Sequence, residues 1–519
     1  MRLLAFAHII CLSVNLISAN HNVYERNLAY KSPFVDHPQL AHNTRNLHDT
    51  NIQRRQTIDA ASFKDEHYIT FYGSDFSNGD PFDTSVLLWT RAVPISSTGA
   101  LPDQSVPVCL SFKIATTSDL SGKIIDSGEA FTSYDVDWTV KVEASGLKPD
   151  TKYFYQFSDC ASKTSSPIGS TRTIASANNL MFPEQGWFNA YGFAAHNTTA
   201  DIFIHLGDYI YESLGSGAKI GRQTLGRELA TIHDYRQRLN QYRTDQSLVT
   251  AHQNAPWITV WYVADNSWKA GTADSNDTTI GCAFSPSGAC FTDRKLAAVR
   301  AYHEWMPIRQ VDPQDKLRIW RNFQIGKLLD LTMLDTRQYD RDLTDVYYNT
   351  VDLDAWDGYR ANRARVLDHL YNNKISNTII LSGDSHANWV SDLAHPNDTV
   401  TYNPTTGAGA IGVEFAGTAV TSGSAFGSGI TPEKADVISR TLVDVNADLQ
   451  WSEGSYRGFF TLSIDSDHLN ATYYAMRNVS FANLDGFASA QFTVKAGQNR
   501  LSRPVAGGSV NAGVLKSQL

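Results

Sequence analysis

The stretch ILSGDSHANW, residues 380–389, places an aspartate and a histidine two positions apart directly after an apolar run. A second stretch, ADIFIHLGDYIYE at residues 200–212, also ends an apolar run in Gly-Asp. Apolar runs of this kind predict strands that are buried on both faces, and the residues between them show helical spacing. The pattern therefore predicts an α/β domain from about residue 185, with a buried and largely parallel sheet.

Further segments extend this pattern along the chain. Residues 257–261 and 328–334 are apolar runs that we expect to form strands. Apolar side chains recur three or four positions apart within residues 228–252, 294–305 and 363–371, which predicts helices there.

The segment 66–173 differs from the rest, because short β-branched or aromatic runs alternate with turn-forming residues. The runs are residues 86–91, 108–114 and 153–157, and turns are expected at 77–81 and 146–149. This spacing predicts a small all-β sandwich of antiparallel strands. We interpret it as a packing module that precedes the α/β domain.

Composition and a leader sequence narrow the class of protein. The 519 residues exceed one ordinary core, so we expect two or three structural units. The net charge is −9 and no long Lys or Arg run occurs, which argues against a nucleic-acid partner. Residues 1–19 have the pattern of a signal peptide, and no other stretch is apolar enough to span a membrane. We therefore expect a secreted protein whose residues 20–65 form an N-terminal extension.

The cysteines and glycosylation sequons agree with export. Without Cys11 of the leader, four cysteines remain, an even number that suits an oxidising compartment. Three pairings are open, and we favour Cys109–Cys160 with Cys282–Cys290 because the latter pair closes a short polar loop. A glycoprotein is predicted from the sequons at Asn197, Asn276, Asn397, Asn470 and Asn478.

Polar residues follow several of the predicted strands. They are Asp208 and Tyr211, Asp335 and Arg337, and Asp384 and His386. Ligands of open α/β sheets bind beyond the carboxyl ends of the strands, so we expect these side chains to share one crevice. Carboxylates gathered in a crevice repel one another unless cations lie between them, and mixed Asp, His and Tyr ligands suit iron or manganese. Two such ions can hold both oxygens of an in-line phosphoryl displacement, which predicts a phosphoester hydrolase.

Each of these residues also has a plainer interpretation. A single Gly-Asp after a strand is most often a turn or a helix cap. His205 lies inside an apolar strand, where we expect a hydrogen-bonded core histidine, and Arg337 could pair with a carboxylate instead of a phosphate. The occurrence of GDYIYE together with GDSHAN favours the metal site over these alternatives.

A series of ordered motifs resembles the alkaline phosphatase D (PhoD-type) family, particularly its secreted fungal members. The motifs are GDP (79–81), LWTR (88–91), GWFNAYG (186–192), HLGDYIYE (205–212), AVRAYHEWMPIR (298–309), LDTRQYD (334–340), AWDGY (355–359), SGDSHANW (382–389), VEFAGTAVTS (413–422) and YRGFF (456–460). The resemblance implies an α/β metallophosphatase-like domain with a mixed, layered sheet at 174–497, preceded by the small all-β sandwich domain. Residues 498–519 would be a C-terminal tail, in which we expect disorder after about Arg503.

The resemblance also implies a chemistry. It indicates a secreted hydrolase of phosphomonoesters or phosphodiesters, with iron and calcium as cofactors and a metal-activated hydroxide as the nucleophile. The substrate would be a small-molecule or lipid phosphoester. By their places in the motifs, the implied metal ligands are Asp208, Tyr211, Asp357, Asp384 and His386, and Arg337 would contact phosphate.

The chain departs from the family pattern at three places. A strand that ends in Ser-Cys, whose cysteine binds iron in the family, is absent at 174–180. A DDHE ligand cluster is absent at 261–266, and a helix-and-strand unit is absent between residues 350 and 351. Because the flanking motifs are intact, we interpret the gaps as missing coding segments. They predict weakly held metal ions, an impaired enzyme and an exposed sheet edge.

Two other functions agree with the sequence. One is a phospholipase D-like phosphodiesterase on the same scaffold. The other is a noncatalytic secreted protein that binds phosphate or another ligand in the remaining pocket, which the missing ligands favour. A structural cell-wall protein is disfavoured, because low-complexity Ser/Thr or Pro tracts are absent. No sequence feature indicates an oligomeric state.

Overall fold

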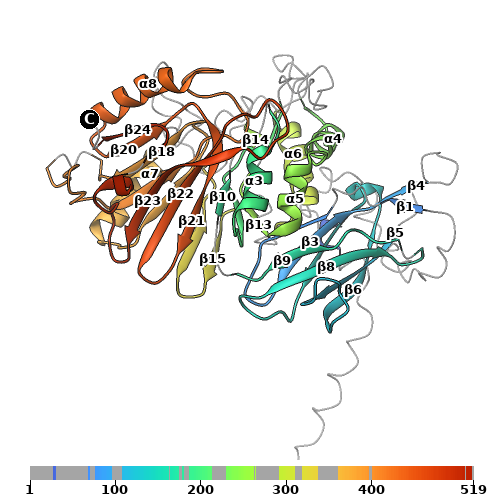
Figure 1. Ribbon diagram of the computed structural model, residues 1–519. Helices are drawn as coiled ribbons and strands as arrows, with labels where there is room; N and C mark the ends of the chain where they lie inside the picture. The colour runs from blue at the N-terminus through green and yellow to red at the C-terminus, as the bar shows by residue number, and fades with distance from the viewer. Residues whose placement is uncertain are drawn as a thin grey trace, which may run out of the picture.

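The fold is that of a computed structural model (Figure 1). It describes residues 27–30, 68–70, 76–95, 108–162, 164–174, 178–180, 186–212, 229–261, 263–264, 291–309, 318–336, 360–396, 400–508 and 510–516. Its α-helices are α3 (Asn189–Asn197), α4 (Ile232–Tyr242), α5 (Gln246–Asn254), α6 (Phe291–Trp305), α7 (Arg360–Asn372) and α8 (Pro432–Val445), and its 3-10 helices are η2 (Leu28–Tyr30), η5 (Tyr134–Val136) and η9 (Val505–Gly508). None of the helices in these ranges is long and apolar enough to cross a membrane.

A nine-stranded sheet runs through the molecule. Its strands, in spatial order, are β23 (Gly486–Lys495), β22 (His468–Met476), β21 (Arg457–Ile464), β10 (Asn178–Leu180), β11 (Phe203–His205), β13 (Trp257–Thr259), β2 (Phe76–Gly79), β3 (Val86–Arg91) and β7 (Thr139–Ala144). Only β10, β11, β13 and β2 pair in parallel, and the remaining neighbours are antiparallel. The prediction of a largely parallel sheet is therefore wrong. Successive strands near each end of the chain pair antiparallel with one another and extend the parallel centre on both sides.

The position of the absent Ser-Cys strand is filled in this sheet. Strand β10 pairs in parallel with β11 and antiparallel with β21. The nine-stranded sheet is therefore continuous at the place of the absent Ser-Cys strand, so the expectation of an exposed edge is wrong at this gap. The ligand-bearing cysteine of the family is still absent, because β10 reads Asn-Asn-Leu.

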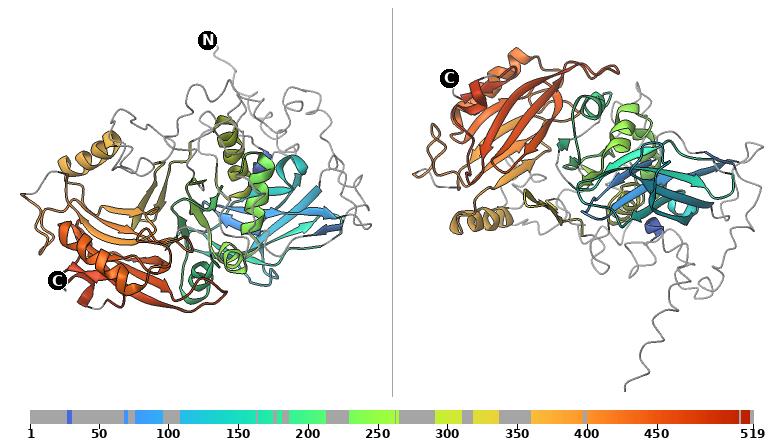
Figure 2. Two further views of the ribbon diagram at one scale, coloured as in Figure 1. Left: turned by 90° about the horizontal axis from the view of Figure 1, so that it is seen from above. Right: turned by 60° about the horizontal axis from the view of Figure 1, so that its bottom comes forward.

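A second sheet covers the C-terminal end of the first. Its strands, in spatial order, are β17 (Ile379–Ser382), β19 (Gly412–Ala416), β18 (Asn388–Leu393), β20 (Leu449–Glu453) and β24 (Val514–Leu515). One hydrophobic cluster joins the two sheets, with Val390, Phe415 and Trp451 from the five-stranded sheet and Phe460 and Tyr473 from the nine-stranded sheet. Figure 1 and Figure 2 show these sheets as two layers, with α8 outside the second.

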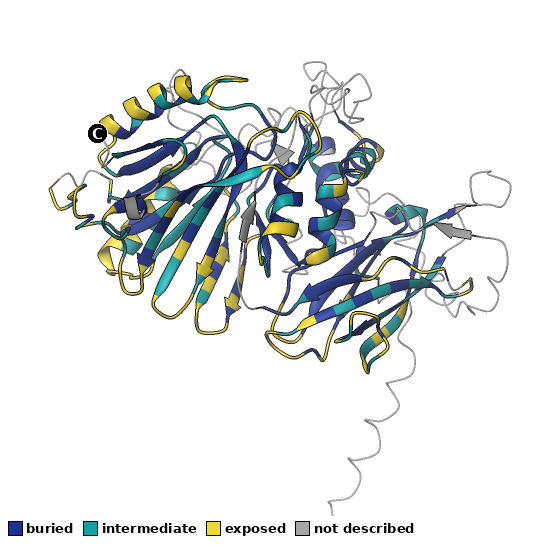
Figure 3. Ribbon diagram, in the orientation of Figure 1, coloured by how far each residue is buried: buried dark blue, intermediate teal, exposed yellow. Residues whose placement is uncertain are grey.

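The outer helix and the C-terminal segment complete this layer. Helix α8 turns Ala435 and Val443 inward and leaves its outer face exposed (Figure 3). The C-terminal segment is ordered, because β24 pairs antiparallel with β20 and both Val514 and Leu515 are buried. The expectation of a disordered tail is wrong for residues 504–508 and 510–516. Small and polar residues concealed a few apolar side chains that are sufficient to seat the segment.

The N-terminal strands form a further layered region at the opposite end. A four-stranded sheet contains β6 (Ile124–Thr132), β5 (Val108–Ala115), β8 (Lys152–Asp159) and β9 (Gly169–Arg172). Its apolar side chains share a buried cluster with those of β2, β3 and β7 from the nine-stranded sheet. The expected strands at 86–91, 108–114 and 153–157 are confirmed. The expected disulfide Cys109–Cys160 is also confirmed, whereas Cys282 and Cys290 lie outside the described residues.

Strand β2 corrects the expected turn at 77–81. Phe76–Gly79 is a buried strand, and the chain turns only after Gly79. The polar side chain of Asn78 conceals this strand in the sequence. Its amide nitrogen donates to the carbonyl oxygens of Ser170 at 3.1 Å and His252 at 3.2 Å, so the nitrogen end of the side chain is satisfied inside the core.

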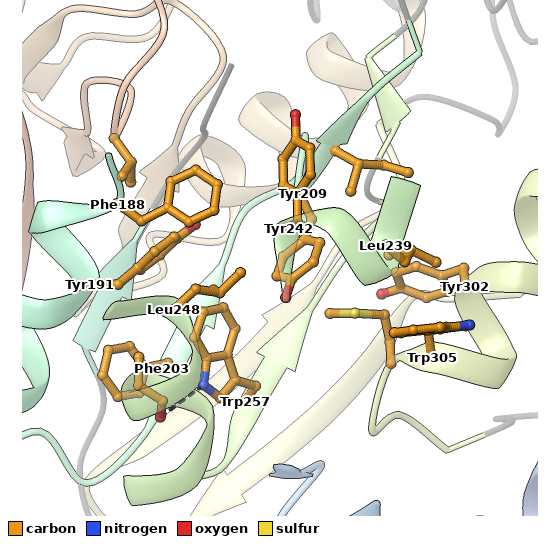
Figure 4. Close-up of a cluster of buried hydrophobic side chains, with 14 of the residues drawn as sticks. Phe188, Tyr191, Phe203, Tyr209, Leu239, Tyr242, Leu248, Trp257, Tyr302 and Trp305 are labelled. Carbon is orange, nitrogen blue, oxygen red and sulfur yellow. Dashed lines mark hydrogen bonds between the residues drawn. The ribbon is translucent and has the colours of Figure 1, made fainter. Parts of the chain in front are cut away.

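The helices on the central strands enclose an aromatic core. The expected helical segment 228–252 is divided into α4 and α5, because Asp245 caps α5 by accepting from the backbone N–H groups of Ser247 and Leu248. Aromatic side chains fill the space between these helices and β11 and β13. Figure 4 shows Tyr191, Tyr209 and Trp257 within this cluster.

Three two-stranded sheets complete the described fold. They are β1 (Tyr68–Thr70) with β4 (Val93–Ile95), β12 (Ile210–Tyr211) with β14 (Val263–Ala264), and β15 (Arg321–Ile325) with β16 (Leu329–Met333). Strand β16 is the run expected at 328–334. It is half of an antiparallel hairpin and not a central strand, so only alternate side chains are buried.

Candidate active site

Two strand ends, one from each large sheet, converge on the candidate site. Asp208 follows β11 and adopts a left-handed backbone with φ 46° after Gly207 at φ 117°. Asp384 and His386 follow β17 with φ 73° and 52°. Left-handed backbone at a residue other than glycine costs roughly 1–3 kcal/mol and is concentrated at functional sites. Both Gly-Asp motifs therefore contain a strained left-handed residue shortly after the strand.

The Tyr211 hydroxyl joins the two loops. It lies 3.2 Å from Oδ2 of Asp208 and 3.2 Å from Nε2 of His386. Asp208 is buried, whereas Tyr211 and His386 are partly exposed. The structure therefore brings together a carboxylate, a phenol and an imidazole that are up to 178 positions apart in the chain.

The imidazole of His386 has a defined orientation. Its Nδ1 lies 2.9 Å from the carbonyl oxygen of Gly423. A carbonyl oxygen can only accept a hydrogen bond, so Nδ1 carries the proton. In the neutral ring, Nε2 then presents its lone pair toward Tyr211, whose single hydroxyl hydrogen is shared between Asp208 Oδ2 and Nε2. This tautomer has Nε2 ready to accept a proton or to bind a cation.

Buried polar side chains brace the loop that carries His386. Asn388 donates from Nδ2 to Oε2 of Glu453 at 2.9 Å, and its Oδ1 accepts from the backbone N–H of Thr418 at 2.9 Å. The loop that begins at Thr418 continues to Gly423, the acceptor for His386. Sequence reasoning assigned no role to Gly423 or to Asn388. The motifs VEFAGTAVTS and GDSHAN beside them were the available signals.

The remaining predicted site residues are placed as follows. Asp384 lies in the same loop as His386 and is partly exposed. Asp335 accepts a hydrogen bond from Nε1 of Trp261 at 2.9 Å. Arg337 and Asp357 lie outside the described residues, so their predicted contacts with phosphate and metal stay predictions.

The segment that lacks DDHE runs alongside Tyr211. Strand β14 pairs in parallel with β12, with Tyr211 opposite Ala264. Ligands inserted just before β14 would therefore enter the chain close to the candidate site.

Other carboxylates of the motifs have architectural roles. The ion pairs are Asp80–Arg321 at 2.8 Å, Glu212–Arg294 at 3.0 Å and Glu304–Arg236 at 2.7 Å. All six side chains are nearly or fully buried, and burial of a charge requires such a partner. The acidic residue that ends HLGDYIYE thus stabilises the helices and does not belong to the site.

His205 also belongs to the core. Its Nε2 lies 3.0 Å from the Tyr191 hydroxyl, and the side chain is fully buried. Burial lowers the pKa of His205 to about 3. The expectation of a hydrogen-bonded core histidine is confirmed.

The donor set of the candidate site fits a metal ion. Carboxylate, phenolate and imidazole groups together suit iron or manganese, and the oxygens also suit calcium. The fit depends on the tyrosine. Among the described residues, the one group of three His, Cys, Asp or Glu donor atoms within 4.8 Å of one another is Cys109, Glu129 and Cys160, and its cysteines form the disulfide.

Comparisons with known proteins identify the family of this chain. A family model described as PhoD-like phosphatase matches residues 173–352 and 344–473, and the model of the PhoD-like phosphatase N-terminal domain matches residues 74–175. Alkaline phosphatase D of Bacillus subtilis (strain 168) is 28% identical over 516 residues, which cover 85% of this chain and 83% of the relative. A solved structure of PhoD matches with a TM-score of 0.69 and 26% identity, over 86% of this chain and 96% of that chain. The chain therefore belongs to the PhoD-like phosphatase family, and this membership supports a phosphoester hydrolase of the alkaline phosphatase D type.

Proposed function

We propose that this chain is a secreted, metal-dependent hydrolase of phosphomonoesters or phosphodiesters. The observation that carries the proposal is the convergence of Asp208 after β11, Tyr211 at the end of β12 and His386 after β17. Such a constellation has the donor types of a metal centre and lies where α/β sheets bind ligands.

The residues have distinct roles in this proposal. Asp208, Tyr211 and His386 would hold the metal, with Asp384 and Asp357 as further ligands. A bound metal would polarise the phosphoester and lower the pKa of a water molecule. The Gly423 carbonyl keeps the proton of His386 on Nδ1, so that Nε2 faces the reacting groups. Arg337 would contact the phosphate, since a guanidinium matches two phosphate oxygens. Iron and calcium are the proposed ions.

A second candidate function is noncatalytic binding of phosphate. Two observations favour it. The described site joins Asp208 and His386 through a tyrosine, without a third His, Cys, Asp or Glu donor close to both. The segment beside Tyr211 also lacks the DDHE cluster. A centre depleted in this way would hold metal weakly and bind phosphate without turnover.

Hydrolysis assays separate these functions. The full chain is exported from a secretion host, supplied with Fe³⁺ and Ca²⁺, and assayed on p-nitrophenyl phosphate and bis(p-nitrophenyl) phosphate. We expect hydrolysis that is lost in Asp208→Asn and retained in Asp201→Asn, whose carboxylate pairs with Arg172 at 2.9 Å. The preferred ester distinguishes a phosphomonoesterase from a phospholipase D-like phosphodiesterase. Equal rates for the unmodified chain and Asp208→Asn would overturn the enzymatic proposal, and phosphate binding without turnover would establish the second candidate.

The interrupted motifs have their own test. We propose that coding segments are missing at 174–186, 261–263 and 350–351. Sequencing of the mature transcript should reveal a Ser-Cys strand and a DDHE segment at the first two junctions. A transcript that matches the present sequence would show that the centre is truly depleted and would favour the noncatalytic function.

We also propose processing and packing roles for the N-terminal parts. Residues 1–19 would be removed as a signal peptide, and residues 66–173 would form a β-sandwich that packs against the catalytic domain. Asn197, Asn470 and Asn478 are exposed and would carry glycans. A mass decrease on treatment with an N-glycosidase, together with N-terminal sequencing of the exported protein, tests these assignments.

A further inference from the structure

A buried arginine lies directly behind His386. Arg457 begins β21, belongs to the motif YRGFF and is 7% exposed. Its Nη1 donates to the carbonyl oxygen of His386 at 3.1 Å and to that of Ser422 at 2.8 Å. Its Nη2 lies 3.4 Å from the carbonyl oxygen of Gly454. One guanidinium therefore contacts three separate backbone segments.

Two of these segments determine where the imidazole lies. His386 has a left-handed backbone, which must be held by its surroundings because it is intrinsically unfavourable. Arg457 binds the carbonyl of that residue. It also binds the carbonyl of Ser422, next to Gly423, whose own carbonyl accepts from Nδ1 of the imidazole. The same side chain thus constrains both the backbone of His386 and the acceptor that orients its ring.

The charge of Arg457 is retained in this position. Burial lowers the pKa of the guanidinium to about 10, and the nearby Glu453 carboxylate opposes that shift. Glu453 is itself held by Asn388 and by the backbone N–H of Tyr456 at 3.0 Å. A lysine has one ammonium group and lacks the planar fork that lets arginine donate in several fixed directions.

We propose that Arg457 is a positioning residue that holds His386 Nε2 toward Tyr211 and Asp208. The inference rests on the proposed metal-dependent function. Residues that orient a metal-binding histidine typically change metal affinity by about 10–100-fold when they are replaced. Arg457 acts through backbone carbonyls and does not touch the reacting groups.

A double-mutant cycle tests this role without any activity assay. The full-length protein is stripped of metal, and the Kd for Mn²⁺ is measured by titration calorimetry for the unmodified chain, Arg457→Met, His386→Ala and the double variant. We expect Arg457→Met to weaken Mn²⁺ binding by about 10–100-fold. In the His386→Ala background, the same substitution should have no further effect, because there is no longer a ring to orient.

Control variants account for general destabilisation. Arg503 binds the carbonyl oxygens of Thr405, Leu501 and Pro404 and forms an ion pair with the buried carboxylate of Asp392, remote from His386 in the described contacts. Arg503→Met should lower Tm without changing the Kd for Mn²⁺. Arg457→Lys keeps a cation in the site and should fold even if Arg457→Met does not, while still binding Mn²⁺ more weakly than the unmodified chain.

The outcomes distinguish the two proposals. If His386→Ala weakens Mn²⁺ binding and folded Arg457 variants bind Mn²⁺ normally, the positioning role is overturned and the metal centre stands. Additive losses in the double variant would likewise show that Arg457 acts only through general stability. If His386→Ala itself leaves Mn²⁺ binding unchanged, the proposed metal centre is overturned, and the role of Arg457 falls with it.

Discussion

Two histidine–tyrosine pairs in this molecule have nearly the same contact and opposite surroundings. Nε2 of His205 lies 3.0 Å from the Tyr191 hydroxyl, and Nε2 of His386 lies 3.2 Å from the Tyr211 hydroxyl. The first pair is enclosed by the aromatic core of the nine-stranded sheet. The second joins two loops at the ends of strands, beside a buried carboxylate. The comparison teaches that the contact itself does not decide what a histidine does.

The surroundings of the two rings show what does decide it. His205 lies in a regular strand, with Trp257 stacked on it at 5.7 Å between ring centroids and Tyr209 at 5.4 Å. His386 has a left-handed backbone and partial exposure, and its Nδ1 is fixed by a carbonyl. Burial among aromatic rings keeps His205 neutral and inert. Access to solvent and a fixed tautomer make His386 available for chemistry.

The largest expected effect concerns the His386–Tyr211 pair. His386→Ala should lower kcat/KM for p-nitrophenyl phosphate by at least about 1000-fold, because loss of a ligand exceeds the 10–100-fold typical of residues that only orient one. Its Tm should change little, since the side chain is partly exposed. The matched control is His395→Ala, which removes a surface histidine paired with Asp368 at 2.7 Å. Activity retained within tenfold would place His386 outside the reacting centre.

The second largest effect concerns the buried His205–Tyr191 pair. His205→Ala should lower the free energy of unfolding by about 2–5 kcal/mol, as for other large-to-small replacements in a packed core. The aromatic rings around His205 lose a packing partner, and Tyr191 loses a hydrogen-bond partner. Urea denaturation measures the change, and kcat/KM per folded molecule should stay near that of the unmodified chain. A change below about 0.5 kcal/mol, typical of surface substitutions, would contradict the core role.

The third effect is the pH dependence that His205 gives to the free energy of unfolding. Burial lowers the pKa of His205 to about 3 from an ordinary value of 6.5. Between these values the unfolded chain binds more protons than the folded chain, so the contribution of His205 to stability is present above pH 6.5 and is lost as the pH falls toward 3. The loss is about 1.4 kcal/mol per pH unit in this window.

Replacement by a neutral amide isolates this contribution. His205→Gln cannot titrate, so its free energy of unfolding should fall less steeply below pH 6.5 than that of the unmodified chain. His252 and His303 are also buried, with pKa values lowered by desolvation, and they remain in both proteins. The effect of His303 therefore cancels in the difference between the two urea-denaturation series. Because His205 also contributes to the lowered pKa of His252, the difference measures His205 together with its coupling to His252. If the free energies of unfolding of the two proteins fall equally from pH 7.5 to 6.0 and 5.0, His205 does not resist protonation.

Local patterns predicted the elements better than their partners. Strands at 86–91 and 153–157 follow from short β-branched or aromatic runs between turns, and the segment 294–305 shows the helical spacing that α6 has. Pairing depends on tertiary contacts, so the antiparallel majority of the large sheet was not predictable from apolar runs. The buried Asn78 concealed β2 for a related reason, because its hydrogen-bond partners lie up to 174 positions away.

The candidate site was predictable where side chains carry the chemistry. Asp208, Tyr211 and His386 belong to the motifs GDYIYE and GDSHAN, whose side chains themselves indicate the chemistry. The structure brings these residues together. Gly423 contributes a backbone carbonyl, which leaves no signature in a side chain. The hydrogen bonds of the Arg457 side chain among the described residues also go to backbone carbonyls. The motif YRGFF therefore indicated where the residue lies in the sequence but not what it does. The motif acid Glu212 was equally ambiguous, because only the fold shows that it pairs with Arg294.

The smallest expected effects come from removing the hydroxyls of Tyr191 and Tyr211, which compares the two histidine–tyrosine pairs at the same atom. Tyr191→Phe and Tyr211→Phe each remove one oxygen and keep the ring. A hydroxyl bonded to a neutral histidine in the core contributes about 1 kcal/mol, so Tyr191→Phe should lower the free energy of unfolding by that amount and leave Mn²⁺ affinity unchanged. Tyr211→Phe should do the reverse, since its hydroxyl lies between Asp208 and His386, where a cation would bind. Urea denaturation and titration calorimetry give, for each of the two variants, the change in the free energy of unfolding and the change in Mn²⁺ affinity. If both variants lose stability and keep Mn²⁺ affinity, Tyr211 is a structural tyrosine like Tyr191, and the metal centre must be built from other residues.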